Sequence, residues 1–262
     1  MPKRCLLSIG TVLVALVSAG VALGDDPAKT VEASGVKGGL IVVIGVDDAQ
    51  ALAEYRVNDT VLVHGLDTVV NLLMIRDAAS GIGNDEIQRV LTPKGVAMVK
   101  GKKTVKPVPD TIDDWSHYLH GPDNNAVAND TEIGPPLHLQ WAGPPRWTRH
   151  HNTIASISSL VSAGGRIFYV LDTGVMKPGE GGGWVVMARD AFNGIDLWRA
   201  PLSAWPQARF RSGPPQLQRL VVASEEHVYV PLELGGPVVK LDAATGKTVR
   251  TFDLPRVRKR SC

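Results

Sequence analysis

Side chains that could bind a metal gather in the middle of the chain. Five of its seven histidines stand between positions 117 and 151, namely His117, His120, His138, His150 and His151. A metal site needs ligands that converge on one face and partners that orient them. His117 and His120 would share a face if helical, whereas His150 and His151 would point apart on a strand. No acidic residue stands at a recognised zinc spacing, so the pattern favours polar groups of a loop-rich segment over a metal centre.

Oxygen and sulfur ligands offer the other candidates for metal chemistry. Asp123, Asn124 and Asn125 could bind a hard cation such as Ca²⁺. The stretch that holds them, Gly-Pro-Asp-Asn-Asn, is rich in turn formers, which favours an ordinary turn. Only two cysteines are present, too few for a cysteine-based zinc site.

Residues 1–24 have the order of a secretory signal peptide. Lys3 and Arg4 precede a long apolar run, and small residues stand just before Asp25. The run is also just long enough to span a membrane as an uncleaved anchor, but its small and hydroxylated residues favour cleavage. We therefore expect a mature chain that begins at Asp25, is periplasmic or otherwise exported, and keeps no stable membrane span.

The charge balance excludes two classes of partner. Removing Lys3 and Arg4 from the 28 basic residues leaves 26, which equals the 26 acidic residues. A neutral chain has no global field to attract nucleic acid or anionic lipid. The basic stretches at 100–106 and 256–260 are short, and we interpret them as a solvated linker and a tail. Nucleic acid is therefore not an expected partner.

Apolar and amphipathic runs predict a small α/β layer over residues 38–99, after a flexible lead-in at 25–37. Strands that alternate with helices indicate a mostly parallel sheet. Asn84 is the expected N-cap of the second helix, and the turn Pro93–Gly95 follows that helix. The expected strands are Gly39–Ile44, Val61–Leu66, Val69–Ile75 and Val96–Val99, and the expected helices are Asp47–Tyr55 and Asn84–Leu91.

Beyond a charged, proline-containing linker at residues 100–110, the pattern changes to all-β. Gly, Pro and Trp punctuate short β-rich runs over residues 111–255, before a basic tail at 256–262. The expected fold class is therefore α+β overall, with a small α/β layer followed by an all-β part. The runs are Leu160–Ser162, Arg166–Leu171, Trp184–Arg189, Leu220–Ala223, His227–Pro231 and Val238–Leu241.

An internal repeat lies within the all-β part. Residues 188–198 match residues 240–250, so that Asp190 and Asp242, and likewise Gly194 and Gly246, are 52 residues apart. Each copy predicts a strand, a tight turn with glycine in the left-handed region, and a return strand. A repeat of β-strands with a period of about 50 residues suggests propeller blades.

The repeat resembles that of PQQ-type (quinoprotein alcohol dehydrogenase-like) β-propellers, in which a tryptophan follows an Asp and a Thr-Gly turn. Stretches between Trp115 and Gly174 also resemble the lead-in of large secreted bacterial proteins of this kind. The resemblance implies that the tryptophan packs between blades and that the other repeat residues fix the turns. In a catalytic member it also implies PQQ with Ca²⁺ as cofactors. The repeat residues are Asp190, Gly194 and Trp198 in the first copy and Asp242, Thr245 and Gly246 in the second.

Residues 38–99 resemble part of a class I S-adenosylmethionine-dependent methyltransferase, which has a Rossmann-like fold. Gly45 stands where that family's first strand enters the cofactor loop, and Asp67 where its second strand ends in the acid that binds the ribose hydroxyls. The loop keeps a single glycine, and Thr68 runs straight into the next strand with no room for the expected third one. The resemblance therefore implies a shortened, degenerate domain with a vestigial cofactor site at Gly45 and Asp67.

Three functions stay open on this evidence, and a non-catalytic one is favoured. At about 50 residues per blade, residues 111–255 hold two blades, too few to close a ring. We therefore expect a propeller fragment that acts as a binding or scaffold module, whose open blade edges favour self-association or a protein partner. The alternatives are a PQQ-dependent alcohol dehydrogenase-like oxidoreductase and an S-adenosylmethionine-dependent methyltransferase.

Export gives the first testable prediction. When the chain is expressed in a Gram-negative bacterium, the intact mass of the periplasmic product should match a chain that begins at Asp25, because the small residues before it suit signal cleavage. Full-length protein in the membrane fraction would instead identify residues 1–24 as an anchor.

Overall fold

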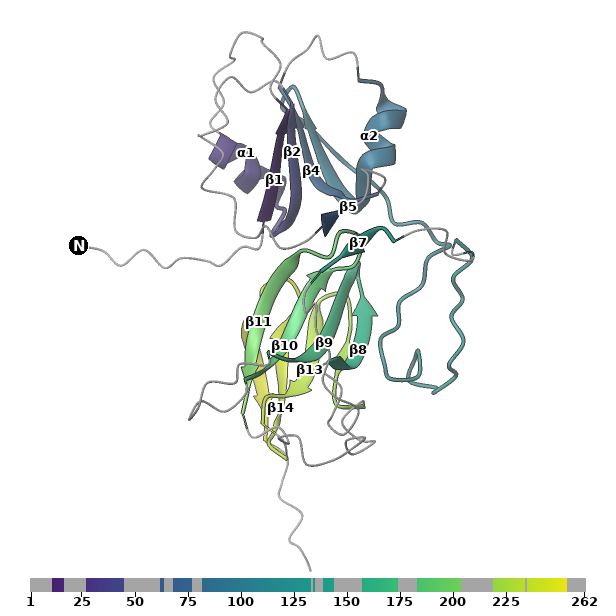
Figure 1. The fold of residues 1–262 in the computed structure, drawn as a ribbon, viewed down its shortest axis with the longest axis vertical. Helices are drawn as coiled ribbons and strands as arrows, with labels where there is room; N and C mark the ends of the chain where they lie inside the picture. The colour runs from purple at the N-terminus through teal and green to yellow at the C-terminus, as the bar shows by residue number, and fades with distance from the viewer. Residues whose placement is uncertain are drawn as a thin grey trace, which may run out of the picture. The chain divides into compact units, whose positions relative to one another are not determined.

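The computed structural model describes residues 11–16, 27–44, 62–63, 68–76, 82–132, 134, 139–143, 157–173, 183–203, 219–233 and 235–253. Over these residues the fold is mostly β-sheet, with several antiparallel pairings and two short helices (Figure 1). The chain divides into two compact units. Unit 1 comprises residues 1–114, 128–146 and 189–198, and unit 2 comprises residues 115–127, 147–188 and 199–262.

Unit 1 is built on a five-stranded sheet with the strand order β1-β2-β4-β5-β6. The first four strands are parallel, and β6 turns back antiparallel to β5. Strands β2 and β4 are nearly continuous apolar runs, as strands covered on both faces require. The strands are β1 Thr11–Leu16, β2 Gly39–Ile44, β4 Val70–Ile75, β5 Leu91–Val99 and β6 Lys102–Val105.

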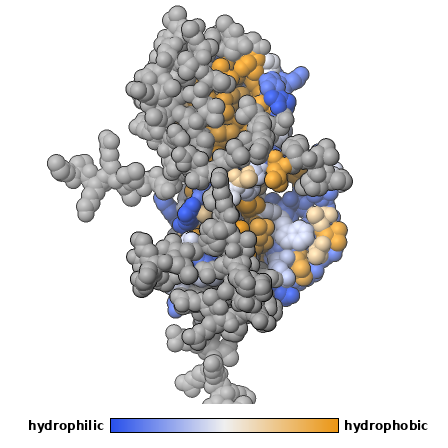
Figure 2. Space-filling view, in the orientation of Figure 1, coloured by the Kyte–Doolittle hydropathy of each residue, from blue (hydrophilic) through white to orange (hydrophobic). Residues whose placement is uncertain are grey.

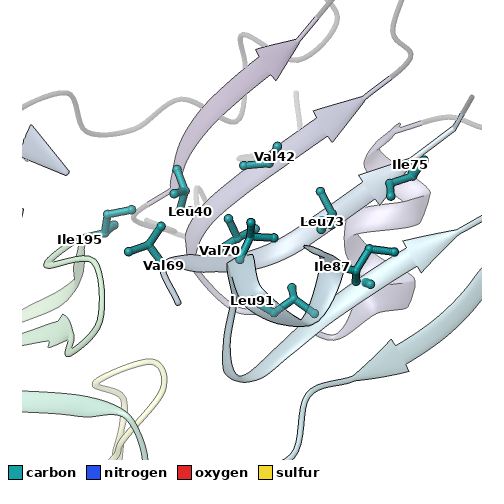
Figure 3. Packing of buried hydrophobic residues seen from close by; sticks show 11 residues of the cluster. Leu40, Val42, Val69, Val70, Leu73, Ile75, Ile87, Leu91 and Ile195 are labelled. Atoms are coloured by element: carbon teal, nitrogen blue, oxygen red, sulfur yellow. The ribbon is translucent and has the colours of Figure 1, made fainter. Parts of the chain in front are cut away.

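The helices α1 (Pro27–Ser34) and α2 (Asn84–Val90) lie on opposite faces of this sheet (Figure 1). Each packs on the alternate residues of β2, β4 and β5 that point to its own face. The outer side of α2 is hydrophilic (Figure 2). The α2 face buries Leu40, Val42, Leu73, Ile75, Ile87, Val90 and Ala97 (Figure 3), and the α1 face buries Ile41, Val43, Leu72, Met74 and Val96.

Several local expectations for unit 1 differ from the structure. Part of the expected flexible lead-in forms α1, because Val31 and Val36 find apolar partners on the sheet. Gly83 is the N-cap of α2, with extended backbone and no side-chain cap, whereas the expected cap Asn84 is already helical. Part of the expected linker forms β6, because the chain after β5 folds back and completes a hairpin.

Strand β3 (Leu62–Val63) does not join the main sheet. It pairs antiparallel with β7 (Trp141–Ala142), so the strand expected at Val61–Leu66 is not the second strand of a parallel layer. The turn expected at Pro93–Gly95 lies inside β5, where the pairing with β4 shifts its register. The helix expected at Asp47–Tyr55 lies outside the described residues.

Two four-stranded sheets form the β-rich part, with the orders β11-β10-β9-β8 and β12-β13-β14-β15. Their strands are neighbours in chain order, which makes each sheet a simple meander. The turn between β10 and β11 belongs to unit 1, and the second sheet lies wholly in unit 2. The strands are β8 Ile157–Ala163, β9 Arg166–Asp172, β10 Trp184–Asp190, β11 Asp196–Leu202, β12 Val222–Ala223, β13 His227–Pro231, β14 Val238–Asp242 and β15 Thr248–Phe252.

Within unit 2 a short segment joins the first strands of the two sheets. The backbone N–H of Trp115 donates to Ser162 Oγ of β8 at 2.9 Å, and the Trp115 carbonyl accepts from the Ser162 N–H at 2.8 Å. The carbonyl of the next residue, Ser116, accepts from the Ala223 N–H of β12 at 3.0 Å. The segment therefore bridges β8 and β12.

The expected signal peptide contributes to the sheet of unit 1 in the uncleaved chain. Thr11–Leu16, from its apolar run, pairs in parallel with β2 as the edge strand β1. Cleavage before Asp25 stays a prediction, and it would leave β2 as the edge of the sheet. No helix within the described residues is long and apolar enough to cross a membrane.

Gly39 tests how tightly the sheet of unit 1 is packed. Its φ is +114°, and an added Cβ would come within 2.1 Å of Asn71 Oδ1. We expect Gly39→Ala to lower the free energy of unfolding by about 2 kcal/mol or more, because both the backbone conformation and the contact become strained. Urea denaturation followed by circular dichroism measures the loss.

Gly101→Ala is the matched control for that substitution. Gly101 also has positive φ, +78°, but an added Cβ would meet nothing within 4 Å. It should therefore show the backbone cost alone, about 1 kcal/mol. Equal losses for the two variants would mean that the Asn71 contact does not constrain this position.

Candidate functional site

The two repeat turns have the same backbone hydrogen bonds. In the first, the Gly194 N–H donates to the Asp190 carbonyl at 3.0 Å, and in the second the Gly246 N–H donates to the Asp242 carbonyl at 2.8 Å. Both glycines are left-handed, with φ of +71° and +68°. The carboxylate oxygen Oδ1 of each aspartate accepts two backbone N–H groups of its own turn. The aspartates and the glycines, each 52 positions apart, therefore have equivalent structural roles.

The turns differ in what the residue before glycine does. In the second turn the Thr245 hydroxyl donates back to Asp242 Oδ1 at 2.7 Å. Asn193 occupies the equivalent position in the first turn and is fully buried, and its Oδ1 accepts from the Ile195 N–H at 3.1 Å. Its Nδ2 donates to the Val69 carbonyl and to Asn71 Oδ1, both at 2.7 Å. The side chain of Thr245 thus bonds within its own turn, whereas the Nδ2 of Asn193 bonds to the chain at the start of β4.

Asn71, which is partly buried, is the centre of this network in unit 1. Its Nδ2 donates to Asp190 Oδ2 at 2.7 Å, while its Oδ1 accepts from the Leu40 N–H at 2.7 Å as well as from Asn193. Ile195, the residue after the turn glycine, is fully buried in the same core as Leu40 and Val69 (Figure 3). The polar groups are satisfied by one another, as burial requires.

The other side of the first turn is packed just as closely. The Trp141 indole N–H donates to the Ala191 carbonyl at 3.0 Å, and a Cβ on Gly194 would fall 2.2 Å from the indole ring. Arg189 is almost fully buried, lies 2.6 Å from an Asp196 carboxylate oxygen, and donates to the Gly194 carbonyl at 2.7 Å. Glycine at position 194 is therefore required by the packing as well as by the turn.

The Asp242 carboxyl is held in its charged form. Desolvation alone would raise its pKa, but hydrogen bonds from the Thr245 hydroxyl, the Thr245 N–H and the Ala244 N–H, with the nearby Arg166 charge, together lower the pKa below its ordinary value. These hydrogen bonds tie the Asp242 carboxylate to its own turn.

The described histidines of the candidate metal segment form a turn instead of a helix. The His117 N–H donates to the His120 carbonyl at 3.0 Å, and Ser116 Oγ lies 2.8 Å from His117 Nδ1. The His120 ring meets the Trp115 ring edge-on, with centroids 5.4 Å apart. No group of three or more metal-ligating side chains is found in the part of the chain that the structure describes, from which His138, His150 and His151 are missing.

The Asp123–Asn125 segment is a turn, as its composition predicts. The Asn125 N–H donates to Asp123 Oδ1 at 3.2 Å, and the Asn124 N–H donates to the Gly121 carbonyl at 3.2 Å. Asn124 has a φ of +58°, which asparagine tolerates better than most residues. The carboxylate is used locally to stabilise the turn.

Unit 2 contains an open groove of about 490 Å³ next to β15. Its walls are mainly apolar, and Glu233 is one of the residues that line it. The Ser203 N–H donates to the Leu232 carbonyl at 2.9 Å and holds the end of β11 against the end of β13. The residues around the groove are Pro201, Leu202, Ser203, Leu232, Glu233, Pro237, Val239 and Thr251.

The sequence-predicted site residues fall into three groups. Gly45 and Asp67, the vestigial cofactor site, lie outside the described residues. Trp198 is buried on β11, with 7% of its surface exposed. The turn residues lie in the two repeat turns. Sequence reasoning missed Asn71 and Asn193, although an asparagine inside the apolar run of β4 was a usable signal, because buried polar groups need partners.

Exchanging Asn193 and Thr245, the residues before the two turn glycines, tests whether the hydrogen bonds of Asn193 stabilise the fold more than those of Thr245 do. Asn193→Thr should lower the free energy of unfolding by about 1–3 kcal/mol, because the Val69 carbonyl and Asn71 Oδ1 lose buried donors. The reverse exchange, Thr245→Asn, should cost much less, since its turn is only partly buried. Chemical denaturation of both variants gives the two losses, and similar values would show that the Asn193 network contributes little.

Comparisons of the chain with protein-family models, with curated proteins and with solved structures find no match. The resemblances to PQQ-type propellers and to methyltransferases therefore stay predictions that rest on the sequence motifs alone.

Proposed function

We propose that the chain is an exported, non-catalytic binding or scaffold module built from β-propeller-type repeats. The observation that carries this proposal is the pair of four-stranded meanders with hydrogen-bond-equivalent Asp–Gly turns between their third and fourth strands. A four-stranded meander is the unit from which propeller blades are made. Two such sheets with matching turns support a blade repeat more strongly than either sheet alone.

Contacts between equivalent parts of the two sheets add support. Trp115 and Ser116 bridge the first strands, β8 and β12. The turns after these strands also meet: the Arg166 guanidinium donates to the Glu225 carbonyl at 3.3 Å, and a Cβ on Gly164 would lie 3.1 Å from Glu225. Successive propeller blades stand side by side in this way, first strand near first strand.

The state of the repeat aspartates favours binding over catalysis. Both oxygens of Asp190 accept hydrogen bonds, from its own turn and from Asn71. Asp242 Oδ1 accepts from two backbone groups and from the Thr245 hydroxyl. A general base must be able to reach the proton that it removes. These carboxylates are committed to holding turns, which is a structural task.

The open parts of unit 2 are where a partner would bind. Strand β15 is the last strand of its sheet within the described residues, and four of its five residues are exposed. The apolar groove lies beside it. An exposed strand edge next to an apolar groove is a surface on which protein segments bind. We therefore propose a protein partner for this module.

Enzyme assays test the non-catalytic part of the proposal. The full chain, incubated with PQQ and Ca²⁺, should give no dye-linked oxidation of primary alcohols above a protein-free control, and S-adenosylmethionine should give no heat in calorimetry. Oxidation that Asp190→Asn or Asp242→Asn abolishes would overturn the proposal in favour of a quinoprotein dehydrogenase. Saturable S-adenosylmethionine binding would instead support the methyltransferase alternative.

A further inference from the structure

We propose that β15 binds an extended segment of a partner protein as a fifth strand, and that the segment alternates acidic and apolar residues. This inference rests on the proposed binding role and names the chemistry of the partner. Strand addition draws its affinity from main-chain hydrogen bonds and its specificity from alternate side chains. Each of these two contributions has a structural basis in unit 2.

The charge of the partner follows from a row of side chains across the sheet. The pairing register places Tyr229 of β13 opposite Lys240 of β14, and Lys240 opposite Arg250 of β15. Opposed residues of antiparallel strands share a face, so the two cations stand side by side. Val222 of β12 completes the row, which therefore contains no carboxylate. Like charges directly opposite destabilise a sheet, and an added acidic residue would relieve this.

The aromatic residues show which way Arg250 points. Its guanidinium carbon lies 4.9 Å from the centroid of the Phe252 ring, and the Phe252 and Tyr229 rings are 6.5 Å apart. Arg250 itself is exposed, whereas Tyr229 and Lys240 are partly buried. The cation therefore lies over a partly apolar surface near the edge of β15 that no other strand of the described residues pairs with. A carboxylate on a strand added beside β15 would meet the guanidinium while it stays over the Phe252 ring.

Asp242 is an acid of the same strand as Lys240, and its carboxylate is bound within its own turn. Asp242 follows two residues after Lys240 on the same strand, and its Oδ1 accepts from Thr245 and Ala244. The nearby Arg166 charge also stabilises this carboxylate. Asp242 stands opposite His227 and is not in the row that holds Lys240 and Arg250.

The apolar residues of the partner segment are inferred from the face of the sheet opposite to Arg250. Thr251 lies next to Arg250 in β15, points to the other side of the sheet, and lines the groove with Leu202 and Val239. A strand added beside β15 would alternate in the same way. Its acidic residues would meet Arg250, and its apolar residues would face the groove.

Arg250 also argues against a second copy of β15 as the occupant. It is the central residue of the five-residue strand Thr248–Phe252. Two β15 strands paired antiparallel in full overlap would place Arg250 opposite Arg250, which repels. One residue thus disfavours self-pairing and favours an acidic strand, as specific interfaces do.

Fluorescence anisotropy with labelled peptides tests this proposal on the full chain. A seven-residue peptide that alternates glutamate and valine should bind, and one that alternates lysine and valine should not. Arg250→Glu should weaken binding of the glutamate peptide at least tenfold and allow binding of the lysine peptide. Methylating alternate backbone nitrogens of the glutamate peptide should abolish binding, because strand pairing needs those N–H groups.

Lys247→Glu is the matched control, since Lys247 is an exposed cation in the turn before β15 and lies outside the row. It should bind the glutamate peptide within about twofold of the unchanged chain. Equal weakening by both variants would show general electrostatic attraction, and undiminished binding of the methylated peptide would exclude strand addition. Either result, or no binding of the glutamate peptide, overturns this proposal. The non-catalytic role is decided separately by the enzyme assays.

Discussion

Asn71 places a carboxamide inside an otherwise apolar strand, and much of unit 1 is arranged around that group. The Asn71 amide is partly buried, and an amide withdrawn from water needs partners for its donors and its acceptor. Leu40 supplies one through its backbone N–H, and the repeat turn supplies the others through Asp190 and Asn193. The close approach of Asn71 also leaves no room for a side chain at Gly39. One polar residue therefore joins β4 to β2 and to the first repeat turn.

The two repeat turns show how one local structure is adapted to different surroundings. Their backbone bonds are the same because Asp and Gly at the same spacing stabilise the same turn. What differs is the burial of the residues around the glycine. Ile195 is buried where the second copy has the exposed Lys247, and Asn193 bonds outward where Thr245 bonds inward. The divergence between the copies is thus an adaptation of the first turn to the packing of unit 1.

The sheet β12–β15 has two different faces, which gives unit 2 its proposed use. Along β13 and β14, buried valines and leucine alternate with partly exposed polar residues. A propeller blade enclosed on both sides would bury both faces. Here one face carries Lys240, Arg250 and aromatic rings, a composition suited to a polar partner with some apolar contact. Among the described residues, this face therefore combines exposed charge at Arg250 with the outer edge of β15.

The sequence by itself determined the features that depend on near neighbours. The strands β2 and β4, the meander strands and the Asp–Gly turns lie where their apolar runs and spacings predict, because pleating and turn chemistry act over a few residues. Tertiary structure alone decided that β3 pairs with β7, that the lead-in folds as α1, and that Asn71 meets Asn193 across 122 positions. Such pairings depend on which distant surfaces meet, and no local pattern encodes them. The contact between the cations Lys240 and Arg250 likewise follows from strand register, since the two residues become neighbours only when β14 and β15 pair.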